Sequence, residues 1–326
     1  MAFSEGLFSS NEMINQTSVT GFVLLGFSSI RELQSFHFVV FLSIYLVAMI
    51  GNFLIITTVL QNHHLHTPMY FFLVNLSVVD IGYISTTVPK SMANSLLDTK
   101  LISYPGCVTQ VLLVNTFGGS ELSLLTVMAY DRYVAICYPL QYCLIMNWNV
   151  CVKMTAASLL CSAINGVVQA TSMFSLHFCS SHVVEQFFCD FPELLKISCS
   201  DTQPIIWNIF AITLIACSTC FLLVLISYIY IFSTVFKIQS AQGRRKAFST
   251  CTPHLIVFSF FLTTAMFSYL RPKSLSSLPL NLLSAVLYTI LPPVMNPIIY
   301  SLRNRDIQVA VLKMLNKRVK FHIMNS

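Results

Sequence analysis

Seven long apolar segments dominate the hydrophobic pattern of the chain, and polar stretches separate them. A helix needs about 20 predominantly apolar residues to cross a bilayer, and each segment is that long. The segments cover residues 36–60, 69–92, 108–136, 149–171, 204–236, 247–270 and 280–302. The pattern therefore predicts an all-α membrane protein folded as a seven-transmembrane helix bundle.

The two ends of the chain differ from these segments. Residues 1–35 are mostly polar and irregular, and they lack the basic start and apolar core of a cleaved signal peptide. In residues 303–319, basic residues alternate with Ile307, Val311, Leu312 and Leu315, which is typical of an amphipathic helix lying on the membrane. We expect a single domain over 1–326, with a 1–35 terminus, a 36–302 bundle and a 303–326 tail containing this short helix.

Composition narrows the class of protein. Hydrophobic residues make up 56% of the 326 and charged residues only 9%, whereas soluble domains carry roughly 25% charged residues. The mean hydropathy of +0.74 agrees with a protein that crosses the membrane several times. The net charge of +6 does not indicate a nucleic-acid partner, because the basic residues flank apolar spans instead of forming a domain.

The placement of Lys and Arg predicts the orientation in the membrane. Cytoplasmic loops carry an excess of basic residues, and one side of the predicted bundle holds twelve against six on the other. The twelve are Arg132, Lys153, Lys237, Arg244, Arg245, Lys246, Arg303, Arg305, Lys313, Lys317, Arg318 and Lys320. We therefore expect a multi-pass plasma-membrane protein with an extracellular amino terminus, glycosylated at the Asn15-Gln16-Thr17 sequon.

Two carboxylates lie inside apolar segments. An ionisable residue at such a depth is a functional candidate, and Asp80 and Glu121 are the pair. If they converge, they must share a proton or bind a cation such as sodium, because like charges at low dielectric cannot both ionise unaided. The alternative is two neutral acids bonded to nearby polar groups. No other cofactor and no metal site is expected.

The triplet Asp131-Arg132-Tyr133 ends the third segment. A charged pair is costly at that depth unless it lies at the membrane boundary or is partnered. Taken alone, the triplet is explained by a helix-terminal ion pair whose arginine extends to the cytoplasmic surface. The residues around it and four other stretches favour a more specific interpretation.

Those five stretches together resemble the tetrapod-type (class II) odorant receptors, the olfactory branch of the rhodopsin-like G-protein-coupled receptor family. They are residues 65–70 (LHTPMY), 128–137 (MAYDRYVAIC), 227–228 (SY), 244–254 (RRKAFSTCTPH) and 292–300 (PPVMNPIIY). The resemblance implies a receptor without catalysis that binds a small volatile odorant and activates a stimulatory olfactory G protein, raising cyclic AMP. It implies a switch and G-protein contact formed by Asp131, Arg132, Tyr133, Tyr228, His254, Asn296, Pro297 and Tyr300. One departure is Leu262-Thr263, where these receptors usually carry Tyr-Gly.

Four of the eleven cysteines fall in predicted extracellular segments, where an oxidising compartment permits disulfides. They are Cys107, Cys179, Cys189 and Cys199, and sequence alone leaves three pairings open. The resemblance favours Cys107–Cys189, because Cys107 precedes the third segment and residues 187–190 (FFCD) match the loop element that pairs with it in the family. Cys179–Cys199 is then the expected second bridge.

A ligand-facing side is expected above Glu121. On the third segment, Val111, Val114, Asn115 and Gly118 recur at helical spacing, with Gly119 beside them. Related receptors bind ligands here, which implies further contacts from Ile212, Thr213, Ala216, Leu262, Ala265, Tyr269, Val286 and Thr289. The alternative is that many of these residues only pack helix on helix. Val114 stands where amine receptors carry aspartate, so we expect a neutral, largely apolar ligand.

A transporter or channel is the competing class of function. It requires charged residues along a path through several helices, or a pair of broken helices in repeated halves. Asp80 and Glu121 are the two intramembrane candidates, and no internal repeat is evident. An enzyme is disfavoured further, because the sequence carries no His-Glu-x-x-His metal motif and no glycine-rich phosphate loop.

Overall fold

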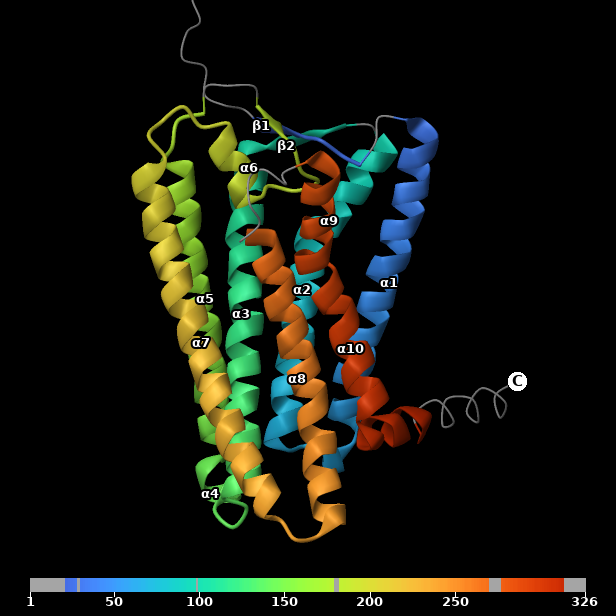
Figure 1. Ribbon diagram of the computed structural model, residues 1–326. Helices are drawn as coiled ribbons and strands as arrows, with labels where there is room; N and C mark the ends of the chain where they lie inside the picture. Colours follow the sequence, from blue (N-terminus) through green and yellow to red (C-terminus); the bar gives the residue numbers. More distant parts are fainter. Residues whose placement is uncertain (1–20, 28–29, 98, 179–181, 270–276, 314–326) are drawn as a thin grey trace, which may run out of the picture.

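Six long helices and one bent helix pair run side by side through the computed structural model (Figure 1). The helices are α1 (Arg31–Gln61), α2 (Pro68–Leu97), α3 (Tyr104–Cys137), α5 (Trp148–Phe174), α7 (Gln203–Lys237), α8 (Ala241–Tyr269) and the pair α9 (Leu278–Thr289) with α10 (Leu291–Arg303). The structure describes residues 21–27, 30–97, 99–178, 182–269 and 277–313. All seven are apolar and long enough to cross a membrane, which confirms the predicted seven-transmembrane bundle.

The helices extend past the apolar segments that predict them. For example, α1 begins at Arg31 and α8 at Ala241, so that Arg244 and Lys246 lie within the helix. Apolar runs mark only the part of a helix inside the hydrocarbon, and polar turns continue the same backbone ladder into the interface. Residues 305–313 form the start of the predicted tail helix, and Ile307 and Ala310 of this segment are buried.

The seventh span is bent instead of continuous. Its two parts, α9 and α10, meet at Ile290 with an angle of 41°. Pro292 and Pro293 follow directly, in the first turn of α10. Proline has no N–H to donate to the preceding turn, so it suits a helix start and interrupts a helix interior. The predicted span over 280–302 is therefore present, with a bend at the start of its proline-rich part.

A small sheet joins three distant segments at one end of the bundle. Strand β1 (Gly21–Leu24) pairs antiparallel with β2 (Leu101–Ser103) and parallel with β3 (Val183–Val184). Phe22 and Leu24 point inward and are buried. The expectation of irregular structure throughout residues 1–35 is thus wrong for 21–24. We call this end, which also carries α6 (Phe191–Lys196), the sheet end (Figure 1).

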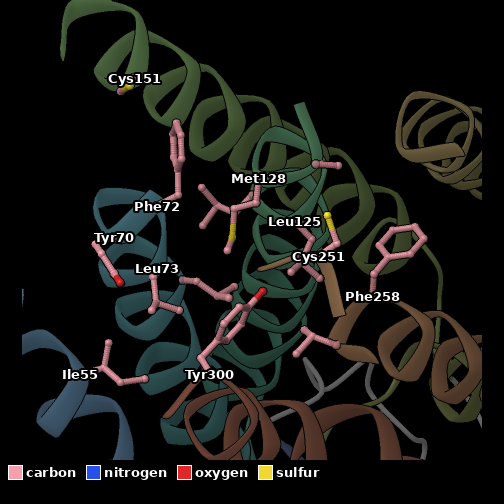
Figure 2. Packing of buried hydrophobic residues seen from close by; sticks show 14 of the residues in the cluster. Ile55, Tyr70, Phe72, Leu73, Leu125, Met128, Cys151, Cys251, Phe258 and Tyr300 are labelled. Atoms are coloured by element: carbon pink, nitrogen blue, oxygen red, sulfur yellow. The ribbon is translucent and has the colours of Figure 1, made fainter. Parts of the chain in front are cut away.

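The opposite end carries the short elements η1 (His63–Leu65) and α4 (Tyr142–Ile145) with residues 305–313, and we call it the tail end (Figure 1). Its apolar core joins α1, α2, α3, α7, α8 and α10, with Leu73, Leu125 and Met128 almost fully buried (Figure 2). In lipid, close packing of side chains stabilises such contacts, because the surrounding tails are as apolar as the core. Small residues therefore matter where helices approach closely.

Gly166 marks the closest such approach. A Cβ at this position of α5 would meet the hydroxyl of Thr116 and the carbonyl oxygen of Leu112 on α3. Gly119 of α3 faces the same interface, because its Cβ would lie 3.3 Å from Ser162 Oγ of α5. The α3–α5 contact is the most extensive between any two elements. Gly119 thus takes part in helix packing, the alternative that the sequence left open for this set of residues.

Candidate functional site

The two intramembrane carboxylates do converge. Asp80 of α2 and Glu121 of α3 are fully buried, and both accept hydrogen bonds from one amide, Nδ2 of Asn296 on α10. The distances are 3.1 Å to each Asp80 oxygen and 2.8 Å to Glu121 Oε1. The remaining oxygen, Glu121 Oε2, is buried and has no hydrogen-bond partner among the residues that the structure describes.

This cluster cannot hold two negative charges with only a neutral amide to compensate them. Taking even one carboxylate out of water costs several kcal/mol unless an opposite charge accompanies it. A proton shared by the pair or a bound cation resolves the conflict, and the unpaired Glu121 Oε2 is an acceptor or proton site of the required kind. Because α2, α3 and α10 supply one residue each, a change of charge at the cluster affects all three helices at once.

Asn52 of α1 bonds the backbone carbonyl that Pro297 leaves without an N–H donor in α10. Pro297 lacks the N–H that would bond the Pro293 carbonyl, one turn earlier. Nδ2 of Asn52 donates to that carbonyl at 2.9 Å, and Asn52 is completely buried. Gly51 lets α1 and α10 approach, since its Cβ would lie 3.0 Å from the Pro297 ring. Asn296 is thereby left for the carboxylates.

At the tail end, Arg132 is buried and does not extend to the surface. The residue is 8% exposed, and Nη2 lies 3.7 Å from Oδ2 of Asp131, whose side chain is 1% exposed. The explanation as an arginine reaching to the cytoplasmic surface is therefore not supported.

Tyr142 of α4 is a further partner of Asp131, and the sequence analysis did not single it out. Its hydroxyl donates to Asp131 Oδ1 at 2.7 Å. Burial, together with the adjacent Asp131, raises the pKa of Tyr142, so the phenol stays protonated and remains a donor. The loop after α3 thus helps to hold Asp131. No periodic or motif signal marks Tyr142, because its role depends on how this loop folds back.

Three further predicted switch residues, Tyr228 of α7, His254 of α8 and Tyr300 of α10, are buried in the bundle. The Tyr228 hydroxyl and His254 Nδ1 lie 2.9 Å apart, and His254 Nε2 lies 2.7 Å from the Leu125 carbonyl oxygen of α3. Tyr300 is buried, and its hydroxyl has no hydrogen-bond partner. Tyr133 instead points to the periphery, where its ring contacts Tyr138 and Tyr230.

The predicted ligand residues fall into different packing layers. Val114 and Val286 belong to an apolar cluster at the sheet half of the bundle, together with Phe187 and Phe188. Val111 lies nearer the sheet end, beside Cys107 and Cys189, while Leu262 packs toward the tail-end core. The structure therefore places some of the predicted ligand residues in one apolar cluster, and contact with a ligand stays a prediction for each of them.

The remaining predicted ligand residues have varied surroundings. Asn115 donates its amide to the Val111 carbonyl of its own helix, and Gly118 faces the Tyr83 hydroxyl of α2. Thr289 is fully buried and bonds within α9. Ile212 and Ala265 are half-buried, whereas Thr213 and Ala216 are exposed on α7. Tyr269 ends α8, and its side chain lies outside the described set.

The loop between α5 and α7 closes over the sheet end. The predicted Cys107–Cys189 disulfide is confirmed and ties this loop to the start of α3. Gln110 of α3 adds a second tie, because its Oε1 accepts a hydrogen bond from the Cys189 N–H at 2.8 Å. The pairing of Cys179 with Cys199 and the glycosylation at Asn15 involve residues 179 and 15, which lie outside the described residues.

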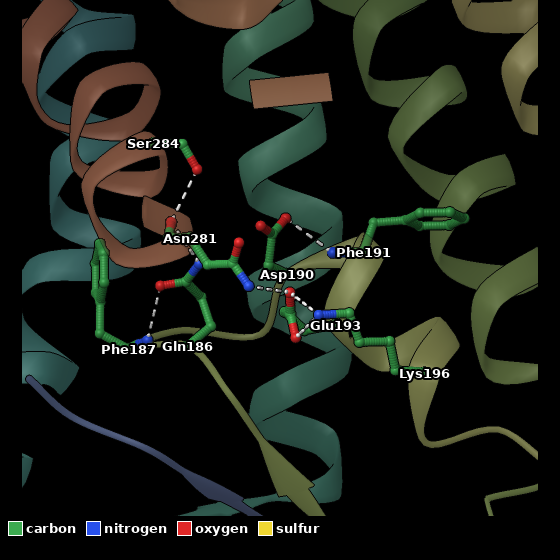
Figure 3. Close-up of polar contacts among 8 residues, drawn as sticks. All are labelled: Gln186, Phe187, Asp190, Phe191, Glu193, Lys196, Asn281 and Ser284. Atoms are coloured by element: carbon green, nitrogen blue, oxygen red, sulfur yellow. Dashed lines mark hydrogen bonds and ion pairs between the residues drawn. The ribbon is translucent and has the colours of Figure 1, made fainter. Parts of the chain in front are cut away.

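A polar cluster that the sequence did not reveal connects this loop to α9 (Figure 3). Glu193, only 5% exposed, accepts from Lys196 at 2.7 Å and from Asn281 Nδ2 at 3.2 Å. Gln186 donates to the Asn281 carbonyl oxygen at 3.2 Å. Nearby Asp190 caps α6, and burial raises its pKa to about 7.

Comparison with known proteins gives a consistent result. A family model described as "Olfactory receptor" matches residues 41–318. The human "Olfactory receptor 14A2" is 48% identical over 305 residues, which cover 94% of this chain and 97% of that protein. The human "Olfactory receptor 14J1" is 47% identical, covering 94% and 95%, and the gorilla "Olfactory receptor 1G1" is 46% identical, covering 92% and 96%.

Proposed function

This chain belongs to the olfactory receptor family, and we propose that it binds a small, neutral, largely apolar volatile and activates a stimulatory olfactory G protein that raises cyclic AMP. Family membership makes the chain an odorant receptor that couples to a G protein, and not an enzyme. The ligand class, the binding residues and the kind of G protein are the proposed parts.

The ligand class rests on the lining of the sheet half of the bundle. Val114 and Val286 lie in one cluster with aromatic and aliphatic side chains from four helices and the loop. Each buried methylene contributes roughly 0.8 kcal/mol, and micromolar affinity corresponds to about 8 kcal/mol. A medium-sized apolar volatile with one or two hydrogen bonds therefore reaches micromolar affinity or weaker after the cost of association.

The observation that carries the coupling proposal is the buried Arg132 at the tail end. Asp131 restrains it in the resting state, and Tyr142 in turn holds Asp131. Release of Arg132 would give the G protein a cationic contact in the cleft among α3, α7 and α8. The basic run at Arg244 and Lys246 borders the same end of α8.

We also propose that the cluster of Asp80, Glu121 and Asn296 binds a sodium ion or shares a proton. The residues fit a small cation, because two carboxylates meet and Glu121 Oε2 has no other partner. The bound charge would stabilise the arrangement of α2, α3 and α10 in one conformation. Ligand binding and ion binding are then coupled through α3, and each changes the affinity for the other.

The orientation follows from the basic residues, with the sheet end extracellular and the tail end cytoplasmic. The amino terminus, with its sequon at Asn15, would then lie outside the plasma membrane. An epitope tag after Ser326 should be labelled only in permeabilised cells, whereas an amino-terminal tag should be labelled on intact cells. Labelling of the Ser326 tag on intact cells would overturn this orientation.

The function is tested by comparing signalling with transport. Cells that express the chain are exposed to a panel of medium-chain aliphatic aldehydes, ketones and esters while cyclic AMP is recorded. At least one should raise cyclic AMP in a dose-dependent manner, with no parallel flux of ions or solute. Flux without a cyclic AMP response would instead support a transporter or channel.

A further inference from the structure

Residues 186–193 form a plug at the sheet end of the bundle. Phe187 and Phe188 are 1% and 0% exposed, and they pack among side chains of α1, α2, α3 and α9. Phe187 contacts Phe27 and Phe41, with ring centroids 5.4 and 5.8 Å apart. We call residues 186–193 the loop plug. Its rings share one apolar cluster with Val114, a residue of the proposed ligand face.

The loop plug is tied to two sides of the bundle in different ways. On the α3 side, the ties are the Cys107–Cys189 disulfide and the bond from Cys189 N–H to Gln110. On the α9 side, the contacts are non-covalent, and they include the packing of the Phe188 ring against Tyr288 and hydrogen bonds with Asn281. Nδ2 of Asn281 donates to Glu193, and the Asn281 carbonyl accepts from Gln186 (Figure 3). The disulfide holds the loop plug to α3 permanently, whereas the non-covalent contacts with α9 can break.

Glu193 is the central residue of the contact between the loop plug and α9. Its carboxylate is buried, yet it accepts two bonds from Lys196 Nζ, at 2.7 and 2.8 Å, and one from Asn281. The Lys196 side chain is 48% exposed, so its ammonium neutralises the carboxylate while remaining hydrated. Hydrogen bonds to charged groups are stronger than neutral ones, and a buried donor left without its acceptor is destabilised.

We propose that Glu193 and Asn281 are positioning residues for odorant recognition, because their hydrogen bond latches the loop plug to α9 and holds it closed over the ligand. This inference rests on the proposed function, in which the ligand binds beneath the plug. Without this hydrogen bond, the loop plug moves away from α9 while the Cys107–Cys189 disulfide still holds it to α3. The ligand then dissociates faster. Affinity changes of this kind arise mainly in the dissociation rate.

The test uses two readouts of the full receptor in cells. The first is the cyclic AMP dose–response to an aldehyde, ketone or ester that activates the parent. The second needs no agonist, because a Ser284→Cys reporter in α9 measures opening through its rate of labelling by a membrane-impermeant maleimide. Ser284 is 6% exposed and lies one turn from Asn281 on α9, so we expect a thiol at this position to become accessible when the plug opens.

Glu193→Ala should raise the EC50 and the labelling rate about tenfold each, the factor expected for loss of one charged hydrogen bond. Glu193→Gln keeps an acceptor for Asn281 and should restore most of both values. Glu185→Ala removes an exposed acid from the same loop and should change neither. If Glu193→Ala does not reach the surface, Asn281→Leu breaks the same bond from the other side.

The outcomes separate this inference from the proposed function. If no volatile activates the parent receptor, the proposed function fails, and the labelling rates still decide whether the latch exists. Equal labelling of the Glu193→Ala and Glu185→Ala receptors would overturn the latch. Faster labelling with an unchanged EC50 would overturn the role in recognition.

Discussion

Neutralising Glu121 should weaken sodium binding by about two orders of magnitude. Asp80 and Glu121 both bond Nδ2 of Asn296, at 3.1 and 2.8 Å, so the bonded oxygens are at most 5.9 Å apart. Two unit charges at that separation interact by about 3 kcal/mol at an effective dielectric constant of 20. A cation between them lies closer to each carboxylate than the two carboxylates lie to each other, so it gains at least this amount from each, and Glu121→Gln removes one of the two attractions. A loss of about 3 kcal/mol is about 100-fold in affinity.

The assay is thermal unfolding of detergent-purified receptor, with sodium chloride replaced by choline chloride at constant ionic strength. Sodium that binds the folded state should raise the Tm of the parent, and the midpoint of that rise should move about 100-fold higher in Glu121→Gln. Ser120→Ala is the matched control, because its neighbouring hydroxyl bonds only the Thr116 carbonyl of its own helix. If the pair shares a proton instead, the pH profile of the Tm should differ between the parent and Glu121→Gln, because only the Asp80 carboxyl of the pair can still titrate in the variant. Identical salt and pH profiles in all three proteins would refute the reasoning.

Three further predictions follow from the packing and from the loop. Gly118→Leu should weaken the agonist response without reducing surface expression, while Gly118→Ala should be tolerated because its Cβ would lie 3.4 Å from the Tyr83 hydroxyl; an unchanged dose–response for the leucine variant would place the ligand elsewhere. Gly166→Ala should destabilise the purified receptor by about 1–3 kcal/mol in thermal unfolding, because the added methyl overlaps the Thr116 hydroxyl, and a Tm equal to the parent would show that α3 and α5 are not packed so closely. Burial, with repulsion from Glu193, raises the pKa of Asp190 to about 7, against the favourable effects of Tyr288 and Lys196; since an opened plug returns this pKa toward about 4, opening should become easier as pH rises from about 4 to 7. Maleimide labelling at Ser284→Cys should therefore rise with pH more steeply than it does in an Asp190→Asn background, and parallel pH profiles would contradict this.

The sequence predicts best what depends on local patterns. The seven spans follow from apolar runs, because a helix in lipid must satisfy its backbone internally whatever its neighbours are. The convergence of Asp80 and Glu121 was expected because both lie deep in apolar helices. The Cys107–Cys189 bridge required the family resemblance, since spacing alone left three pairings.

The features that the sequence missed depend on distant partners. Strand β1 forms only because residues 101–103 and 183–184 lie beside it in the folded chain. Asn52 compensates a proline in α10, and the latch between Glu193 and Asn281 joins a loop to α9. In the sequence, Asn52, Glu193 and Asn281 carry no distinguishing pattern, because their partners become neighbours only in the folded chain. Gly119 faces α5, and the sequence left open whether such small residues pack against a neighbouring helix or face a ligand, because no periodic signal separates the two.

The most direct test of the central claim is the cyclic AMP response of Arg132→Ala, measured with the volatile that activates the parent receptor. Surface expression is recorded in parallel through an amino-terminal tag, and Lys153→Ala is the control because Lys153 is an exposed basic residue on α5. The buried Arg132 is proposed to meet the G protein on activation, so Arg132→Ala should reach the surface and give no cyclic AMP, while Lys153→Ala signals like the parent. A full response from Arg132→Ala at normal surface level would contradict the account.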